Sequence, residues 1–150
     1  MRRSFASPAR KSTDVFVTAL YAALLTVWFL LLSAIVIRHR GKGISLGDRG
    51  DPGLQRAIRG HGNFAEYVPL ALLMMAILEY SRTSLYVLHA LGLALLIGRI
   101  LHGWALSFTR SWQFGRAWGT GLTFVVLVIE AVLCLQLALR GHELWARGVL

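Results

Sequence analysis

Residues 15–37 read VFVTALYAALLTVWFLLLSAIVI, an unbroken run of uncharged and mostly apolar residues. As an α-helix this run is about 34 Å long at about 1.5 Å per residue, which exceeds the roughly 30 Å hydrocarbon core of a bilayer. The run is too long for the apolar part of a signal peptide, and basic residues follow it instead of a small-residue cleavage site. It therefore predicts a first transmembrane span that is retained in the protein.

Three further segments have the length and apolar character of membrane spans, and they cover residues 54–79, 85–108 and 117–139. Apolar residues make up 56% of the chain and charged residues only 15%, a balance too apolar for an ordinary soluble domain of this length. We therefore predict an all-α fold, in which residues 1–150 form a single transmembrane domain built as a four-helix bundle.

The chain carries a formal net charge of +9, from 16 lysines and arginines against 7 acidic residues. Many of these positive charges stand in short segments between the apolar runs, where they favour contact with anionic lipid headgroups. No basic, aromatic-rich sheet or helix indicates nucleic-acid binding. Basic residues are divided almost evenly between the two sides of the bundle, so the positive-inside rule leaves the orientation open.

The second span differs from the others because its first half is polar. Asp51 and Pro52 form a typical helix start, with an N-cap residue followed by proline at the first helical position. On a helical wheel the polar residues of this half fall on one stripe about 80° wide. These residues are Arg56, Arg59, Asn63 and Glu66. Because a charge at membrane depth costs roughly 2.5–3.5 kcal/mol, the stripe should face the bundle interior, a water-filled cleft or other polar groups.

Chain direction places the beginning of the second span, the end of the third and the beginning of the fourth on the same side of the membrane. Arg99 and His102 share a face of the third span, because residues three apart are neighbours on a helix. We expect Glu66 to pair with Arg99, and Glu130 in the fourth span to be paired within the chain or across subunits. The cluster is either an anion site or a structural polar network that holds the helices together.

The stretch Arg59-x-x-x-Asn63-x-x-Glu66-Tyr67-x-Pro69-Leu70 resembles the second-helix signature of the MAPEG family, the membrane-associated proteins in eicosanoid and glutathione metabolism. The resemblance extends to Arg99 and to the layout of four spans. It implies a left-handed four-helix bundle that assembles as a homotrimer. It also implies that glutathione is a co-substrate and binds between adjacent subunits. The residues expected to contact glutathione or shape its pocket are Arg56, Arg59, Asn63, Glu66, Tyr67 and Arg99.

The end of the third span departs from the family pattern. Glutathione-using members carry tyrosines there, whereas this chain has His102 at the first such position and Leu106 near the second. The arginine that activates the thiol in some members lies just beyond, where Arg110 and Arg116 are both candidates. The candidate catalytic residues are therefore His102, Arg110 and Arg116. A guanidinium would stabilise the glutathione thiolate, which then attacks a lipophilic electrophile that enters from the bilayer.

Four functions remain open at this point. The first is a glutathione transferase or peroxidase, and the second is a non-catalytic membrane protein of the same fold that binds a lipid or a thiol. The third is a small proton-coupled transporter that uses Glu66 or Glu130, although arginines around Glu66 favour its ionised form. The fourth is a bis-histidine cytochrome, but His89 and His102 lie about 220° apart around one helix. We expect a multi-pass protein of a bacterial inner membrane, with no metal site.

Overall fold

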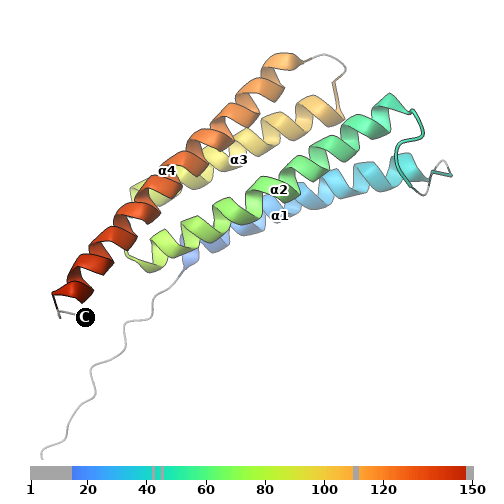
Figure 1. Cartoon of the computed structure of the whole chain (residues 1–150). Coiled ribbons are helices and arrows are strands. Elements are labelled where there is room, and N and C mark those ends of the chain that lie inside the picture. The colour runs from blue at the N-terminus through green and yellow to red at the C-terminus, as the bar shows by residue number, and fades with distance from the viewer. Residues whose placement is uncertain (1–14, 42, 45, 110–111, 148–150) are drawn as a thin grey trace, which may run out of the picture.

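The computed structural model describes residues 15–41, 43–44, 46–109 and 112–147. These residues form the helices α1 (Phe16–Arg40), α2 (Pro52–Tyr80), α3 (Leu85–Ser107) and α4 (Gln113–Ala146). All four are long and apolar enough to cross a membrane, and Figure 1 shows them side by side as one elongated bundle. The all-α fold with four spans is therefore confirmed.

Helices α2 and α3 form the centre of the bundle. They contact each other, and each also contacts both α1 and α4, whereas α1 and α4 share no contact within the described ranges. Side chains from all four helices fill the interior. Its fully enclosed apolar members include Leu25, Leu32, Met75, Leu88, Leu95 and Val126. The central position of α2 and α3 brings the polar half of α2 against the end of α3.

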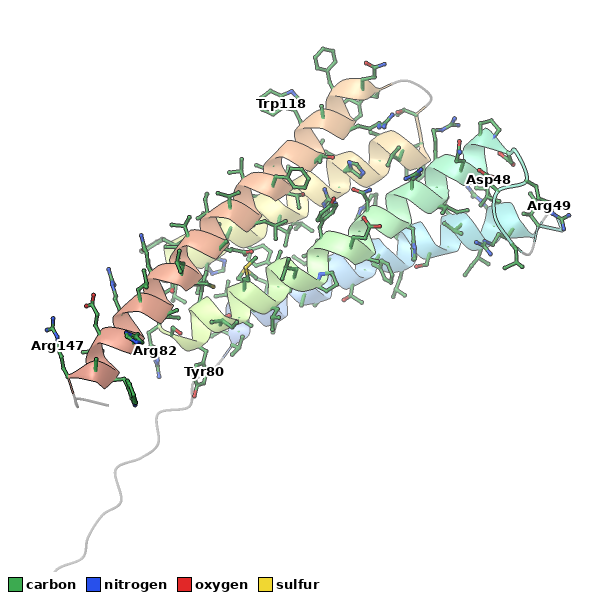
Figure 2. The ribbon with its side chains drawn as sticks, viewed as in Figure 1. Asp48, Arg49, Tyr80, Arg82, Trp118 and Arg147 are labelled. Carbon is green, nitrogen blue, oxygen red and sulfur yellow. The ribbon has the colours of Figure 1, made fainter. Side chains whose placement is uncertain are left out.

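The outer surface of the bundle is apolar along its length and charged at its ends. Large aliphatic side chains such as Leu30, Leu73 and Val128 are mostly exposed, as expected of helices that face lipid or another subunit. Figure 2 shows Arg82 and Arg147 near one end of the bundle and Asp48 and Arg49 at the other. This division matches a bundle that crosses a bilayer with both ends in water.

The predicted start of α2 is confirmed, whereas α4 is longer than predicted. Asp51 caps α2 as predicted, because its carboxylate accepts hydrogen bonds from the backbone N–H of Gly53 at 2.7 Å and of Leu54 at 3.1 Å. Helix α4 continues to Ala146, beyond the predicted end of its span at residue 139. The extension contains Glu143 and Leu144, which favour helix, and a helix need not end at the membrane surface.

Helices α3 and α4 meet in direct backbone contact at Gly98 and Gly119. A Cβ atom placed on Gly119 would lie 2.7 Å from the carbonyl oxygen of Gly98 and 2.7 Å from the backbone nitrogen of His102. Small residues at a crossing let two membrane helices approach closely. This contact fixes how α4 lies over the end of α3, and therefore where His102 sits relative to α4.

Glu79, near the end of α2, caps the first turn of α1. Its two carboxylate oxygens accept hydrogen bonds from the backbone N–H groups of Val17 at 2.7 Å and Thr18 at 2.8 Å. The N-cap residue of α1, Val15, makes no side-chain cap of its own. A buried carboxylate at this place satisfies two donors that the helix leaves free and complements the positive end of its dipole.

We expect Glu79→Gln to destabilise the protein by about 1–3 kcal/mol, because the amide accepts only one of the two bonds and leaves a buried N–H without a partner. Thermal unfolding in a fixed detergent measures this loss. Glu143→Gln, an exposed position on α4, serves as the control and should leave the melting temperature unchanged. Equal melting temperatures for the two variants would show that the cap contributes nothing.

Candidate functional site

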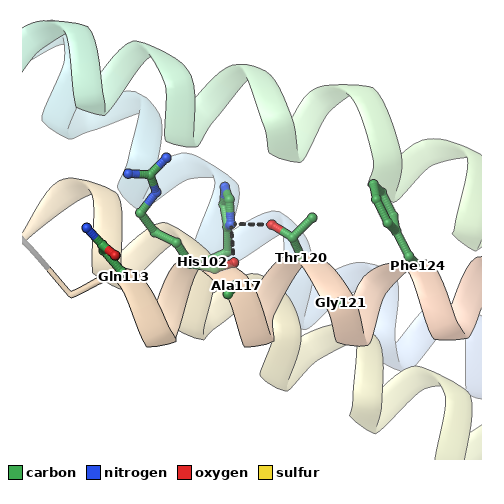
Figure 3. Close-up of a pocket in the computed structure, with 7 residues that line it drawn as sticks. His102, Gln113, Ala117, Thr120, Gly121 and Phe124 are labelled. Atoms are coloured by element: carbon green, nitrogen blue, oxygen red, sulfur yellow. Dashed lines mark hydrogen bonds between the residues drawn. The ribbon is translucent and has the colours of Figure 1, made fainter.

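Polar side chains of α2, α3 and α4 line two adjoining cavities, which we call together the polar cleft. The first cavity, of about 420 Å³, is lined by Gln55, Arg56, Arg59, Asn63, His102, Leu106 and Arg116. The second, of about 530 Å³, is lined by His102, Gln113, Arg116, Ala117, Thr120, Gly121 and Phe124 (Figure 3). His102 and Arg116 belong to both cavities. The cleft therefore extends from Gln55, near the start of α2, to Phe124 in α4.

The structure gathers most of the residues predicted from the sequence. Arg56, Arg59, Asn63, His102 and Arg116 all line the polar cleft. These side chains meet because α2 and α4 both begin at the end of the bundle where α3 finishes, as the chain direction predicted. The remaining candidate for thiol activation, Arg110, lies outside the described residues.

Arg99 lies buried between α2 and α4, beside the polar cleft. Its side chain is 2% exposed, and its guanidinium donates to the carbonyl oxygens of Asn63 at 3.4 Å and Gly119 at 3.2 Å. The same group stands 6.0 Å from the centre of the Tyr67 ring. No carboxylate pairs with it in the part of the chain that the structure describes. Its positive charge is held by carbonyl and ring dipoles alone, which leaves the region electropositive.

The expected pair between Glu66 and Arg99 is wrong. Glu66 is exposed, and across the described ranges it makes no ion pair with Arg99. The reason is its direction on α2: the neighbours Phe64 and Val68 are buried, and each lies two residues, or about 200°, away from Glu66 around the helix. The Glu66 carboxylate therefore faces outward from the single chain.

His102 is the polar residue that α3 contributes to the lining of the polar cleft. It is 7% exposed, and its Nδ1 lies 3.3 Å from the carbonyl oxygen of Arg116 and 3.0 Å from the hydroxyl of Thr120. Its Nε2 is buried and has no hydrogen-bond partner among the described residues. Two contacts from α4 thus fix the Nδ1 side of the imidazole, while Nε2 on the other side has no hydrogen-bond partner in the described ranges.

Tyr67 forms part of the wall next to this cluster. Its ring meets Phe124 of α4 edge to face, with ring centroids 5.4 Å apart, and lies over Arg99 as described above. Tyr67 is half-buried. The Tyr67 ring therefore lies between Phe124 and the Arg99 guanidinium, although it does not line either cavity itself.

Sequence reasoning missed two further residues of α4, one on each side of Arg116. Thr120 and Gln113 line the cleft, and Thr120 stands one helical turn after Arg116, so the same periodicity that defined the α2 stripe indicates it. Glu130 has no partner within the described part of the chain, which contradicts pairing inside the chain and leaves pairing across subunits a prediction. Its side chain is 0% exposed, and neither carboxylate oxygen has a hydrogen-bond partner within the described part of the chain.

Comparison with known proteins places the chain in a family. The pattern that defines the MAPEG family matches residues 18–136, a range that begins in α1 and ends in α4. The chain is also 39% identical over 87 residues to the inner membrane protein YecN of Escherichia coli strain K12, a match that covers 57% of this chain and 66% of YecN. YecN of Escherichia coli strain O6:H1 matches to the same extent.

The match thus spans slightly less than two thirds of the relative's length. No solved structure shows a significant match. The family pattern nevertheless covers most of the chain, including the polar half of α2 and the part of α3 that carries Arg99 and His102. The chain belongs to the MAPEG family and is an integral membrane protein with four membrane-spanning helices.

Proposed function

We propose that the protein binds glutathione in the polar cleft and transfers it to lipophilic electrophiles. The observation that carries this proposal is the charge of the cleft: Arg56, Arg59 and Arg116 line it, and none of the acidic residues that the structure describes does. Glutathione has two carboxylates and one ammonium group, so its net charge is negative. A cleft whose charged side chains are all cationic among the described residues favours such a ligand over a neutral or cationic one.

The individual side chains fit the groups of a thiol tripeptide. Guanidinium groups bind carboxylates through paired hydrogen bonds. The amides of Gln55 and Asn63 can bond the peptide groups. Arg99 adds a buried positive charge beside the cleft, which favours a thiolate over a thiol. No cysteine of the protein is needed, because glutathione supplies the sulfur.

An apolar second substrate has a path to this cleft from the bilayer. A groove of about 360 Å³ on the outer side of α4 is lined by Ala117, Trp118, Gly121, Leu122 and Val125. Ala117 and Gly121 also line the polar cleft, so the apolar groove and the polar cleft adjoin over two small residues. A lipophilic electrophile lying in the groove would reach the cleft across Ala117 and Gly121, because these small residues leave the least barrier.

We also propose that the protein acts as a homotrimer in a bacterial inner membrane, as the family resemblance implies. Glu66 supports assembly, because an exposed carboxylate within a membrane helix is costly unless another subunit or water covers it. Mass spectrometry of the complex released from detergent should show three copies of the chain. A monomer released under gentle conditions would contradict the assembly and leave the cleft proposal intact.

The end of α3 supports a second function, in which the protein binds a thiol without catalysing a reaction. His102 and Leu106 stand where the resemblance implies tyrosines. A protein that has the cleft but no catalytic activity would bind glutathione or a related thiol and release it unchanged. Conjugation assays with a chlorinated aromatic electrophile separate the two. Product formation supports the transferase, and saturable binding without product supports the binding protein.

Arg59→Gln tests the cleft itself. Because a hydrogen bond to a charged group is worth about 1.5–3 kcal/mol, we expect glutathione affinity to fall about 10- to 100-fold. Calorimetric titration of the detergent-solubilised protein measures this change. Arg140→Gln is the matched control, since Arg140 is an exposed arginine near the other end of α4. The same affinity in both variants would reject Arg59 as a contact and the cleft as the site.

A further inference from the structure

One ring nitrogen of His102 has a defined role in the packing of the helices. Nδ1 contacts two groups of α4, the Arg116 carbonyl at 3.3 Å and the Thr120 hydroxyl at 3.0 Å, and Figure 3 draws both contacts. A residue that served only to join α3 to α4 would need no polar atom other than Nδ1. Asparagine could make the same contact, because its side-chain nitrogen takes nearly the position of Nδ1.

The Arg116 carbonyl favours one tautomer of His102. A carbonyl oxygen only accepts hydrogen bonds, so the 3.3 Å contact is a hydrogen bond when Nδ1 carries the hydrogen. The Thr120 hydroxyl both donates and accepts, so it is compatible with either tautomer. With the hydrogen on Nδ1, the neutral ring has its lone pair on Nε2.

Nε2 is therefore a buried acceptor without a hydrogen-bond partner among the described residues. In Figure 3 it points away from the two α4 contacts, toward α2. His102 lines both cavities of the polar cleft. A buried acceptor without a partner is costly unless water or a ligand meets it.

We propose that Nε2 of His102 takes the proton from a glutathione thiol bound in the polar cleft. This inference rests on the proposed function and adds the residue that starts the reaction. The S–H bond breaks as the N–H bond forms at Nε2, which leaves a thiolate and an imidazolium. The sulfur lone pair then forms a bond to the electrophilic carbon. The leaving group departs with its electron pair and receives the proton from Nε2, either directly or through a water molecule, which returns the imidazole to its neutral form.

The charged groups around His102 explain why a base is useful here. They are Arg56 and Arg59 on α2, Arg99 on α3 and Arg116 on α4, and all are positive. They stabilise the thiolate, but they disfavour a proton that stays on the imidazole. His102 therefore acts as a relay that passes the proton onward, and the arginines set how much thiolate exists at equilibrium.

His102→Asn separates the relay from the helix contact, because it keeps a donor for the Arg116 carbonyl and removes Nε2. We expect glutathione affinity to stay within about threefold of the wild type. Conjugation should slow about 10²- to 10⁴-fold, the usual contribution of a positioned base. Stopped-flow absorbance should show the thiolate forming more slowly, with the same final amplitude, and the acidic limb of the pH–rate profile should disappear.

Two further variants make the result specific. His142→Asn makes the same substitution at an exposed histidine of α4 outside the cleft, so thiolate formation should stay at the wild-type rate. His102→Ala leaves a space at the ring position, and added imidazole should restore part of its rate of thiolate formation. A residue that served only for packing would not respond to imidazole in this way.

The outcomes distinguish this inference from the function it rests on. If the wild type binds no glutathione, the proposed function fails and His102 loses its role with it. If the wild type binds glutathione and His102→Asn forms thiolate at the wild-type rate, binding stands and the relay is overturned. Unchanged affinity with slow thiolate formation, together with rescue by imidazole, supports the relay.

Discussion

Gly119→Leu is expected to lower stability by about 3 kcal/mol or more, at the upper end of the cost of overpacking. A Cβ atom at this position meets the Gly98 carbonyl and the His102 backbone nitrogen at 2.7 Å each. Neither is the movable end of a side chain, so α3 and α4 must separate to make room. The separation would also remove the Gly119 carbonyl from the Arg99 guanidinium, which now donates to it.

Gly121→Leu is the matched control, two residues further along the same helix. A Cβ atom on Gly121 meets no heavy atom within 4 Å, so melting in detergent should stay within about 0.5 kcal/mol of the wild type. Because Gly121 lines the cleft, this variant should nevertheless bind glutathione more weakly. If both variants melt alike, the backbone contact between α3 and α4 does not hold these helices together.

Arg99→Met is expected to affect stability and binding in opposite directions. The guanidinium is buried without a carboxylate partner among the described residues, and the desolvation of such a charge costs several kcal/mol, which an apolar side chain of similar volume does not incur. The carbonyl oxygens of Asn63 and Gly119 lie inside helices, so they keep their helical hydrogen bonds. The ligand-free variant should therefore melt at or above the wild-type temperature.

The same variant should bind glutathione at least about tenfold more weakly, because a positive charge beside the cleft is lost. Melting curves recorded with and without glutathione measure both effects in one experiment. Arg99→Lys keeps the charge and should retain more of the ligand-induced stabilisation than Arg99→Met. An Arg99→Met protein that unfolds without ligand would show that the arginine is needed for packing, against this interpretation.

The membrane spans could be predicted because the thickness of the bilayer sets their length. Residues 15–37 are apolar for longer than the hydrocarbon core requires, and the structure has α1 from Phe16 to Arg40. The end of α4 could not be predicted in the same way. Beyond the membrane no apolar requirement applies, and the helix continues for as long as its own propensity and hydrogen bonds allow.

The polar cleft could be predicted in outline because helical periodicity places Arg56, Arg59 and Asn63 on one stripe. The partner of Arg99 could not, because a helical wheel gives the direction of Glu66 on its own helix and not the position of α3. Burial of Phe64 and Val68 turns Glu66 outward. Arg99 is instead held by backbone carbonyls, which occur at every residue and leave no signal in the sequence.

The cap on α1 illustrates the same limit. Glu79 stands at the end of an apolar run, where the sequence indicates only a tight connection to the third span. Its partners, Val17 and Thr18, lie 62 and 61 residues away and contribute backbone N–H groups. Only the packing of α2 along α1 brings the carboxylate to the free end of that helix.

Titration of the detergent-solubilised protein with glutathione, in the wild type and in the double variant Arg59→Gln/Arg116→Gln, tests the cationic character of the cleft most directly. The two substitutions remove positive charges from both sides of the cleft, one on α2 and one on α4. We predict saturable binding by the wild type and a loss of at least about 100-fold in the double variant. A wild type that does not bind, or a double variant that binds equally well, would contradict it.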